Sequence, residues 1–235
     1  MKRGDRLVDE HGVASTAVDR TAHTARGWAV AGYGIIADVS EALVGLLSDR
    51  IREREDVGTV DPDSVALISP DEVGEESDVR LGIYLYNVTE NPTMKNADRT
   101  RAEGTNYRDP PLAIDLQYLV TAYPGSEDSE DSVRSATQHR LLGLAMQVFH
   151  DNARIDAADL PGEIGEDALP QIAVESEPID VLTGLWSSFD GASFAPSVTY
   201  HVGPVFIDSN REESIPDVHE RETRTNPKPD PRRDR

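Results

Sequence analysis

Two alternating segments, residues 81–89 (LGIYLYNVT) and 111–121 (PLAIDLQYLVT), constrain the fold of this chain more than any other feature. In the first segment Leu81, Ile83 and Leu85 point to one side of an extended strand, and Tyr84 and Tyr86 point to the other. The second segment repeats this period of two, which is typical of a strand with one face in the core. We therefore predict two half-buried strands.

The connection between these strands, residues 90–110, spans roughly twenty residues without apolar periodicity. Loops of this length in compact domains are usually either functional or disordered. Its four bases balance its four acids, whereas the whole chain carries a formal net charge of −21. A neutral loop can approach a second acidic copy, or another acidic partner, without large charge repulsion. We predict that it forms a subunit interface, and a loop without a partner is the alternative.

The composition excludes several classes of protein. There is no cysteine, so disulfides and thiolate metal sites are impossible. No apolar run reaches the length of a membrane span, the N-terminus lacks a secretory signal, and no basic stripe is present for nucleic acid. We expect a cytoplasmic protein without membrane or nucleic-acid partners. Its acidity, with only three lysines, resembles proteins of salt-rich cytoplasm, where salt screens the repulsion between carboxylates.

Apolar periodicity divides the chain into a flexible N-terminal arm (1–32), one domain (33–207) and a disordered charged tail (208–235). Within the domain we predict helices from Tyr33 to about residue 51, at 132–150, and near 179–186 with Ser176 as the N-cap. Further strands are expected at 64–68, 171–174 and 198–207, the last interrupted at Gly203-Pro204 by a bend, a bulge or a sheet edge. The predicted fold is therefore α+β or mixed α/β, a mixed sheet covered by two long helices and one short helix.

Motifs for catalysis or cofactor binding are weak. Residues 32–37 (GYGIIA) fit a dinucleotide-binding pattern, but only Trp28 and the three residues after it precede the glycines as a candidate strand. The histidines show no metal-ligand spacing, and no catalytic pair of carboxylates can be singled out among so many. We expect no catalytic residue, no metal and no cofactor. A nucleotide-binding enzyme that uses Gly32 and Gly34 remains the alternative.

The segments YLYNVTENPTMKN, PPLAIDLQYLVTAYP and HRLLGLAMQVFHDN, followed by a short helix ending at Trp186 and by SVTYHV, resemble the N-terminal domain family of tail-cap proteins. Those proteins, also called tail terminators, belong to contractile injection systems, which are phage-tail-like particles. The resemblance extends over approximately residues 35–207 and rests on the order of several elements.

The resemblance implies a structural protein rather than an enzyme. Such subunits form a ring, generally a hexamer, on the end of the inner tube and help to anchor the sheath. The implied partners are further copies of the chain and the tube and sheath proteins, with assembly in the cytoplasm and release as part of an extracellular particle. A monomeric adaptor of the particle is a further alternative.

The resemblance also assigns roles to individual residues. The strands and helices of the family motif correspond to Tyr84, Tyr86, Asn87, Pro92, Pro111, Leu112, Leu116, Tyr118, Leu119, Leu141, Leu142, Met146 and Trp186, of which Leu141, Leu142, Met146 and Trp186 are expected in the core. We also expect Val133 on the buried stripe of the second long helix. The subunit or tube interface is predicted in the loop, at Asn91, Lys95, Asn96, Arg99, Arg101, Tyr107 and Arg108.

Overall fold

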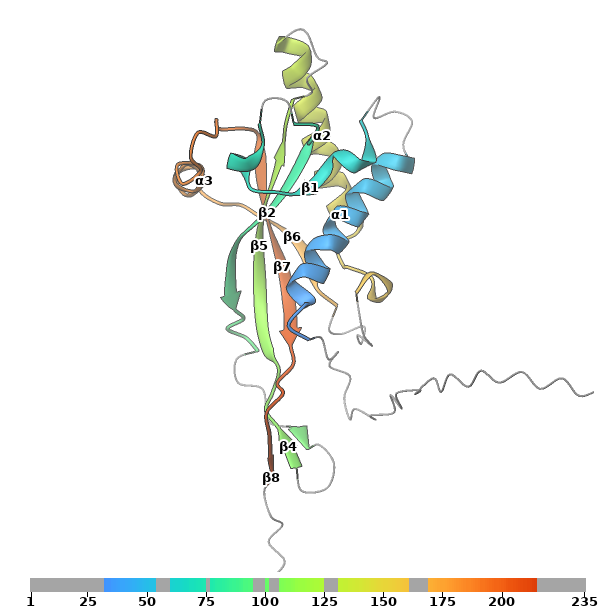
Figure 1. The fold of residues 1–235 in the computed structure, drawn as a ribbon, viewed down its shortest axis with the longest axis vertical. Helices are drawn as coiled ribbons and strands as arrows, with labels where there is room; N and C mark the ends of the chain where they lie inside the picture. The colour runs from blue at the N-terminus through green and yellow to red at the C-terminus, as the bar shows by residue number, and fades with distance from the viewer. Residues whose placement is uncertain are drawn as a thin grey trace, which may run out of the picture.

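The structure is a computed structural model that describes residues 32–53, 60–74, 77–94, 100–101, 106–124, 131–160 and 169–214. A five-stranded sheet forms its centre, and a small three-stranded sheet lies at one end (Figure 1). Along the chain the elements are α1 (Ile35–Glu53), β1 (Val65–Leu67), β2 (Leu81–Glu90), β3 (Thr100–Arg101), β4 (Asn106–Arg108), β5 (Leu112–Ala122), α2 (Asp131–Asp151), β6 (Gln171–Glu175), α3 (Ile179–Trp186), β7 (Ser197–Ile207) and β8 (Glu212–Ser214).

The central sheet has the strand order β1-β2-β5-β7-β6. Only β1 and β2 run parallel, and the other neighbours are antiparallel. The two segments with the clearest alternation, β2 and β5, are direct neighbours. The predicted mixed sheet is confirmed.

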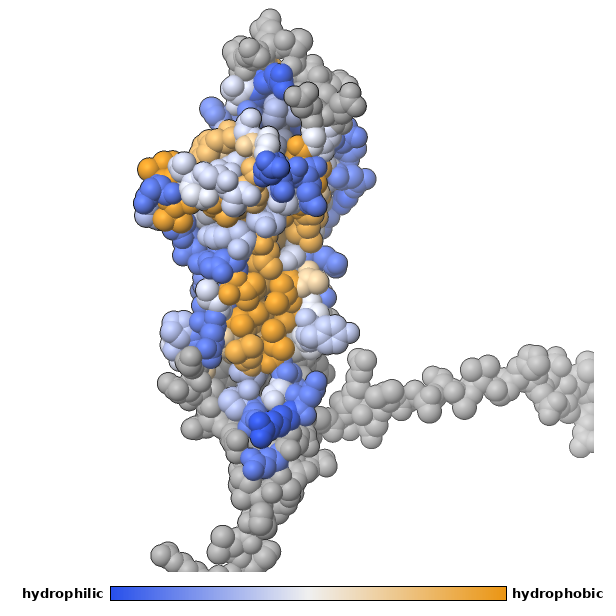
Figure 2. Space-filling view, turned by 60° about the vertical axis from the view of Figure 1, so that its left-hand side comes forward, coloured by the Kyte–Doolittle hydropathy of each residue, from blue (hydrophilic) through white to orange (hydrophobic). Residues whose placement is uncertain are grey.

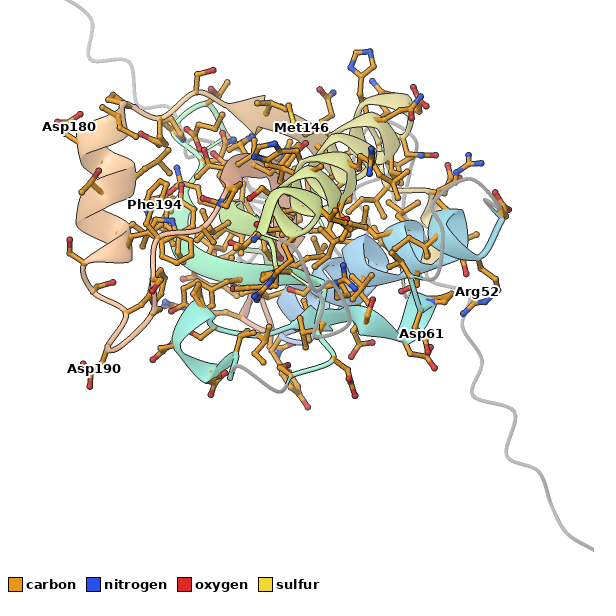
Figure 3. All side chains as sticks on the ribbon, turned by 90° about the horizontal axis from the view of Figure 1, so that it is seen from above. Arg52, Asp61, Met146, Asp180, Asp190 and Phe194 are labelled. Carbon is orange, nitrogen blue, oxygen red and sulfur yellow. The ribbon has the colours of Figure 1, made fainter. Side chains whose placement is uncertain are left out.

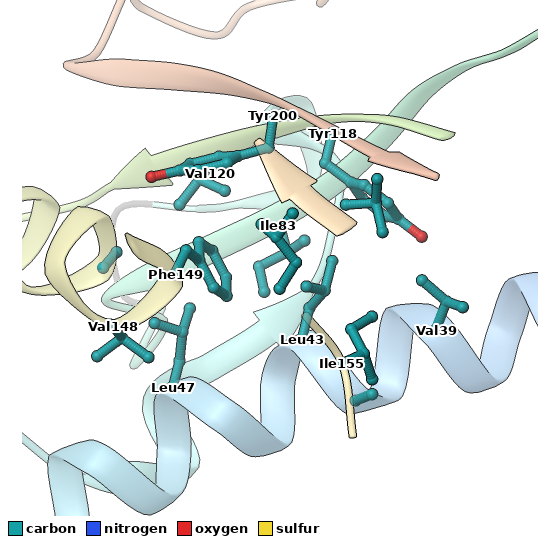
Figure 4. Close-up of a cluster of buried hydrophobic side chains, with 14 of the residues drawn as sticks. Val39, Leu43, Leu47, Ile83, Tyr118, Val120, Val148, Phe149, Ile155 and Tyr200 are labelled. Carbon is teal, nitrogen blue, oxygen red and sulfur yellow. The ribbon is translucent and has the colours of Figure 1, made fainter. Parts of the chain in front are cut away.

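The main core lies between the sheet and the pair α1 and α2. Leu43 and Leu47 of α1 pack with Phe149 of α2 against strand residues such as Ile83 and Tyr118 (Figure 4). These side chains are almost entirely buried, and Ser40 reinforces the contact through a hydrogen bond of 2.8 Å with the Tyr118 hydroxyl. Apolar residues at helical spacing on α1 therefore form one continuous buried face.

The short helix α3 covers the opposite face of the sheet, as the view from above shows (Figure 3). Trp186 and Phe189 pack there on Leu119, with Tyr84 and Tyr86 at the edge of the cluster. The predicted assignment of these tyrosines to the face opposite Leu81 and its partners is confirmed. The predicted cap of α3 is wrong by two residues: Pro178, not Ser176, occupies the N-cap position and makes no side-chain cap hydrogen bond.

Strand β5 differs from the half-buried strand that we predicted. Its residues from Ala113 onward are almost all buried, on both faces, because β5 lies at the centre of the sheet between β2 and β7. Ile114, Leu116 and Tyr118 face the main core, while Leu119 faces the α3 cluster. Leu112, at the open end of the strand, is 47% exposed.

Strand β7 accommodates Gly203-Pro204 in a bulge. Ile114 pairs with Val205 and Leu116 with Val202, so one residue of β5 stands opposite two of β7. Pairing with β6 ends at Gly203, so the missing N–H of Pro204 removes no ladder bond there. Of the three predicted alternatives for this dipeptide, the structure shows the bulge.

The small sheet contains residues of both the loop and the predicted tail. Strands β3 and β4 lie within residues 90–110, and β4 pairs with β8, which lies beyond residue 208 in the predicted disordered tail. The Asp109 N–H also donates to the Arg211 carbonyl (3.3 Å). Periodicity did not reveal these strands because each has only two or three residues. The N-terminal arm predicted at 1–32 lies outside the described residues except for Gly32.

Two helix α2 residues predicted to face the core are on the outside. Met146 is 40% and Val133 is 44% exposed, whereas Leu141, Leu144 and Phe149 are buried. Figure 3 labels Met146 on this helix. The helix has apolar residues around more of its circumference than the sheet can cover, so sequence spacing alone did not identify the buried side.

Candidate functional site

The loop between β2 and β5 is fixed to the sheet at its first residue, Asn91. The Asn91 Nδ2 group donates to both carboxylate oxygens of Asp115, at 3.0 and 3.1 Å. Its Oδ1 accepts the backbone N–H groups of Thr93 and Met94, and its own N–H donates to the Ala113 carbonyl (2.9 Å). One side chain thus sets the direction in which the loop leaves the sheet. The predicted interface residue Asn91 is the root of the loop.

Asp115 is the centre of this root. It is buried, and His201 Nε2 of β7 lies 3.3 Å from its Oδ1. Gly203 faces it across the bulge, where an added Cβ would collide with Asp115 Oδ1 and lie 3.3 Å from the Asp115 Cα. A buried carboxylate needs such hydrogen-bonding neighbours because desolvation penalises its charge. We call Asn91, Asp115, His201 and Gly203 the loop-root cluster.

A row of polar side chains continues from the loop-root cluster across the same face of the sheet. Asn87 Nδ2 of β2 donates to Gln117 Oε1 of β5 (2.6 Å), and Gln117 Nε2 donates to Glu175 Oε2 of β6 (3.3 Å). Burial, with Glu175 and Glu177 close by, raises the pKa of Tyr86 to about 12. The face that carries α3 is therefore apolar under the helix and polar toward the loop.

The α3 cluster presents apolar side chains to the outside as well. Trp186 is buried and its Nε1 donates to Ser197 Oγ (3.2 Å), while the Phe194 ring packs against it and remains more than half exposed. Ile179 and Val181 of α3 are also exposed. Exposed apolar side chains that lie together are typical of contact surfaces.

The predicted interface residues fall into three groups. Asn91 is described and half-buried. Lys95, Asn96 and Arg99 lie outside the described residues. Arg101 lies in β3, and Tyr107 and Arg108 lie in β4, where the structure describes the backbone alone. Their contacts with a partner stay a prediction.

The family-motif residues also separate. Leu116, Tyr118, Leu119, Leu141 and Trp186 are buried, Tyr84, Tyr86, Pro111 and Leu142 are half-buried, and Asn87, Pro92, Leu112 and Met146 are exposed. Sequence reasoning missed Asp115, His201 and Gly203. An acid in the middle of the apolar segment PLAIDLQYLV was the available signal, because a charged side chain in a buried strand needs a partner.

The glycines of the alternative cofactor motif stand in an unfavourable setting. A Cβ on Gly34 would lie 3.6 Å from the Asp38 carboxylate, so a negative charge stands at the start of α1. A shallow hollow of about 290 Å³ along α1 is lined by Asp38, Glu41, Asp49 and Asp159. These carboxylates repel the phosphates that a dinucleotide site must attract.

The described part of the chain holds neither a cluster of metal ligands nor a membrane-spanning helix. No three potential ligands among His, Asp and Glu residues lie close enough together there to hold a metal ion. None of the helices that the structure describes is long and apolar enough to cross a membrane.

The model of the Pvc16 N-terminal domain family matches residues 38–221. The chain belongs to this family. The match covers the central sheet, all of α2 and α3, the loop-root cluster and β8, and it ends within the region that we predicted as a disordered tail. No curated protein matches the chain.

Two terminators are among the solved structures that share the fold. One is the sheath/tube terminator of an extracellular contractile injection system, PVC, in its extended state, with a TM-score of 0.53 and 18% identity over 83% of this chain and 64% of that chain. The other is the tube-terminating cap of the anti-feeding prophage, with a TM-score of 0.51 and 18% identity over 82% of this chain and 62% of that chain. The present chain thus spans less than two thirds of the length of either protein.

Proposed function

We propose that this chain is a structural cap, or terminator, subunit that closes the end of the inner tube of a contractile injection system. The observation that carries this proposal is the match to the Pvc16 N-terminal domain family over residues 38–221, supported by a fold shared with two terminators. A nucleotide-dependent enzyme has no comparable support, because the Asp38 carboxylate lies beside Gly34 at the start of α1 and further carboxylates line the hollow along the helix.

We further propose that the subunits form a hexameric ring and help to anchor the sheath. A ring closes when a head-to-tail contact repeats around an axis. A cap must also bind the tube on one side while its other side provides no binding site for a further tube ring. The two ends of this subunit differ: the small sheet lies at one end and the tip of α2 at the other (Figure 1). Such an asymmetric body suits a subunit that stops growth.

The neutral loop is the proposed subunit contact. The loop-root cluster and the β4–β8 pairing fix where it leaves the body and where it returns. Elsewhere the surface of a chain with a net charge of −21 repels a second copy. Assembly in a salt-rich cytoplasm, before release of the particle, fits this surface because salt shortens the range of the repulsion.

Coexpression with the tube and sheath proteins of the same particle tests the proposal. The mass of the purified chain in about 1 M salt, where the screening length is roughly 3 Å, and negative-stain images of the particles are the two measurements. We expect a ring several times the subunit mass of 25.7 kDa, located at one end of the tubes. A monomer on the particle surface would indicate an adaptor, and a monomer that binds a dinucleotide would indicate an enzyme.

A matched pair of charge reversals tests the loop itself. Arg99→Glu with Arg101→Glu should prevent ring formation and leave the circular dichroism spectrum unchanged. The control, Arg50→Glu with Arg52→Glu, makes the same change in charge on the exposed end of α1, where both arginines form surface ion pairs. The loop is not the subunit contact if both double variants assemble equally well.

A further inference from the structure

An apolar strip lies on the α1 side of the sheet, beyond the start of the helix. It consists of Leu85, Val88, Leu112 and Ile207, which pair across the strands with each other or with core residues. Val88 and Leu112 are 44% and 47% exposed, and Leu85 and Ile207 are half-buried. Figure 2 shows a continuous hydrophobic area on the sheet between hydrophilic margins.

The direction of α1 along the sheet follows from two hydrogen bonds. Ser48 Oγ donates to the Pro62 carbonyl (3.0 Å), just before β1. Strand β1 begins opposite Leu81, and Leu81 pairs with Ala122 at the end of β5. Ser48 therefore lies near the level of the end of β5. Ser40 lies level with Tyr118, earlier in β5. The start of α1 therefore points toward the first residue of β5.

The start of α1 leaves the end of the strip uncovered. The part of the helix from Ser40 back to Ile35 spans about 7.5 Å along the helix axis, which is the length of roughly two residues of a strand. The helix thus begins level with Leu116, which is fully buried. From there β5 continues to Leu112, about 13 Å further on. No other helix of the described part packs on this end of the strands.

The segment that precedes α1 has the reach and the chemistry to fill this space. Residues 1–31 are largely polar, and their longest apolar run is Trp28-Ala29-Val30-Ala31, directly before Gly32. Four extended residues span about 13 Å, and Trp28 and Val30 then share one face. A segment that continued the line of α1 would meet Leu112 without a reversal of the chain. Gly32 leaves room for the connection, since nothing lies within 4 Å of a Cβ built there.

We propose that residues 28–31 lie extended along the apolar strip of their own chain, with Trp28 and Val30 against Val88, Leu112 and Ile207. A tryptophan buries on the order of 200 Å² on docking. The segment has no charged side chain, so it meets the strip without the repulsion that opposes contact between acidic surfaces. This inference concerns the fold of the single chain and does not depend on a role in a particle.

Tryptophan fluorescence of the full chain tests the proposal. The chain has two tryptophans, so subtracting the emission of Trp28→Phe from that of the unmodified chain isolates Trp28 without altering the buried Trp186. Acrylamide is the quencher of choice because it is neutral and is not repelled by an acidic protein. We expect blue-shifted emission and quenching several-fold weaker than that of free tryptophan, at all concentrations at which the chain is monomeric.

Variants of the strip complete the test. Leu112→Ser should shift the Trp28 emission to the red and restore quenching. The control is Val174→Ser, which changes an equally exposed apolar residue, 51% exposed, at the far edge strand β6 and should leave Trp28 protected. The proposal is overturned if Trp28 is fully quenched in the unmodified chain. Protection that appears only when the chain oligomerises also overturns it, because a second copy would then fill the strip.

Discussion

The two faces of the central sheet have different roles. The face under α1 and α2 is covered by aliphatic and aromatic side chains that exclude water almost completely. The face under α3 is apolar only beneath that helix, and toward the loop it holds a buried carboxylate, amides and a histidine. Hydrophobic burial has no direction, whereas hydrogen bonds fix geometry. The first face therefore supplies stability, and the second fixes where the loop leaves the sheet.

Truncating the core under α1 should have the largest effect on stability. We expect Leu47→Ala to lower the free energy of unfolding by about 2–5 kcal/mol, since Leu47 is completely buried and its removal leaves a cavity. Leu67→Ala, at a leucine that is 47% exposed, is the control and should cost less than about 1 kcal/mol. Urea unfolding measures both, and equal losses would mean that this face is not the dominant core.

Alkaline pH should weaken the same core. Burial raises the pKa of Tyr118 to about 12, opposed by its hydrogen bond with Ser40, and burial raises the pKa of Tyr200 to about 12. In the unfolded chain a tyrosine ionises near pH 10, so between pH 10 and 12 the unfolded state binds fewer protons and stability falls as pH rises. At most about 2–3 kcal/mol is lost for each tyrosine. Tm measured from pH 9 to 12 should fall less steeply in Tyr200→Phe, and an unchanged slope would contradict this.

Adding a methyl group inside the loop-root cluster should have an intermediate effect. Gly203→Ala places a Cβ against Asp115 and should lower stability by about 1–3 kcal/mol. In α2, Gly143→Ala meets nothing within 4 Å and should raise stability by about 0.5–1 kcal/mol. Thermal unfolding should therefore show a lower Tm for Gly203→Ala and a higher Tm for Gly143→Ala. Such a result would show that the bulge is tightly packed whereas the helix position is open. A neutral Gly203→Ala would show that the bulge adapts.

Removing the first side chain of the loop should affect the loop more than the fold. Asn91→Ala removes the acceptor for the Thr93 and Met94 amides and a donor to the Asp115 carboxylate, and it should lower overall stability by about 1–2 kcal/mol. Amide exchange at these two residues should rise sharply, while exchange in β5 changes little. If β5 exchanges as fast as the loop in this variant, Asn91 supports the whole sheet and the two faces are not separable.

The smallest effect is expected on the outer side of α2. Met146→Ala should change stability by less than about 0.5 kcal/mol, because Met146 lies on the exposed side of the helix. Leu141→Ala in the same helix should cost about 2–5 kcal/mol, because Leu141 is buried. Comparable losses at the two positions would mean that a partner, or a different helix orientation, covers Met146.

Periodicity predicted most of the main elements because their residues report local geometry. Strands β2 and β5 and helix α1 each carry several consecutive repeats, so their bounds agree with the prediction within a few residues. Periodicity could not show which strand is central. β5 is buried on both faces because of its neighbours, and that is a matter of strand order rather than of its own sequence.

The short strands and the loop-root cluster were out of reach for a different reason. β3, β4 and β8 are too short to show a period, and β8 is more than a hundred residues from the loop that it joins. Asp115, Asn91 and His201 meet only because β2, β5 and β7 are neighbours and because the bulge at Gly203 makes room for the carboxylate. The interface residues Tyr107 and Arg108 stay predictions.

The alternation of β2 and β5, the amphipathic α1, the excess of acid and the neutral loop follow from the amino-acid sequence alone, since each is a property of neighbouring residues. The three-dimensional fold was needed to show which face of the sheet is the core, that Met146 lies outside it, and that one buried carboxylate anchors the loop. Burial and hydrogen bonding depend on distance in space, and strand order brings together residues that are far apart in the sequence.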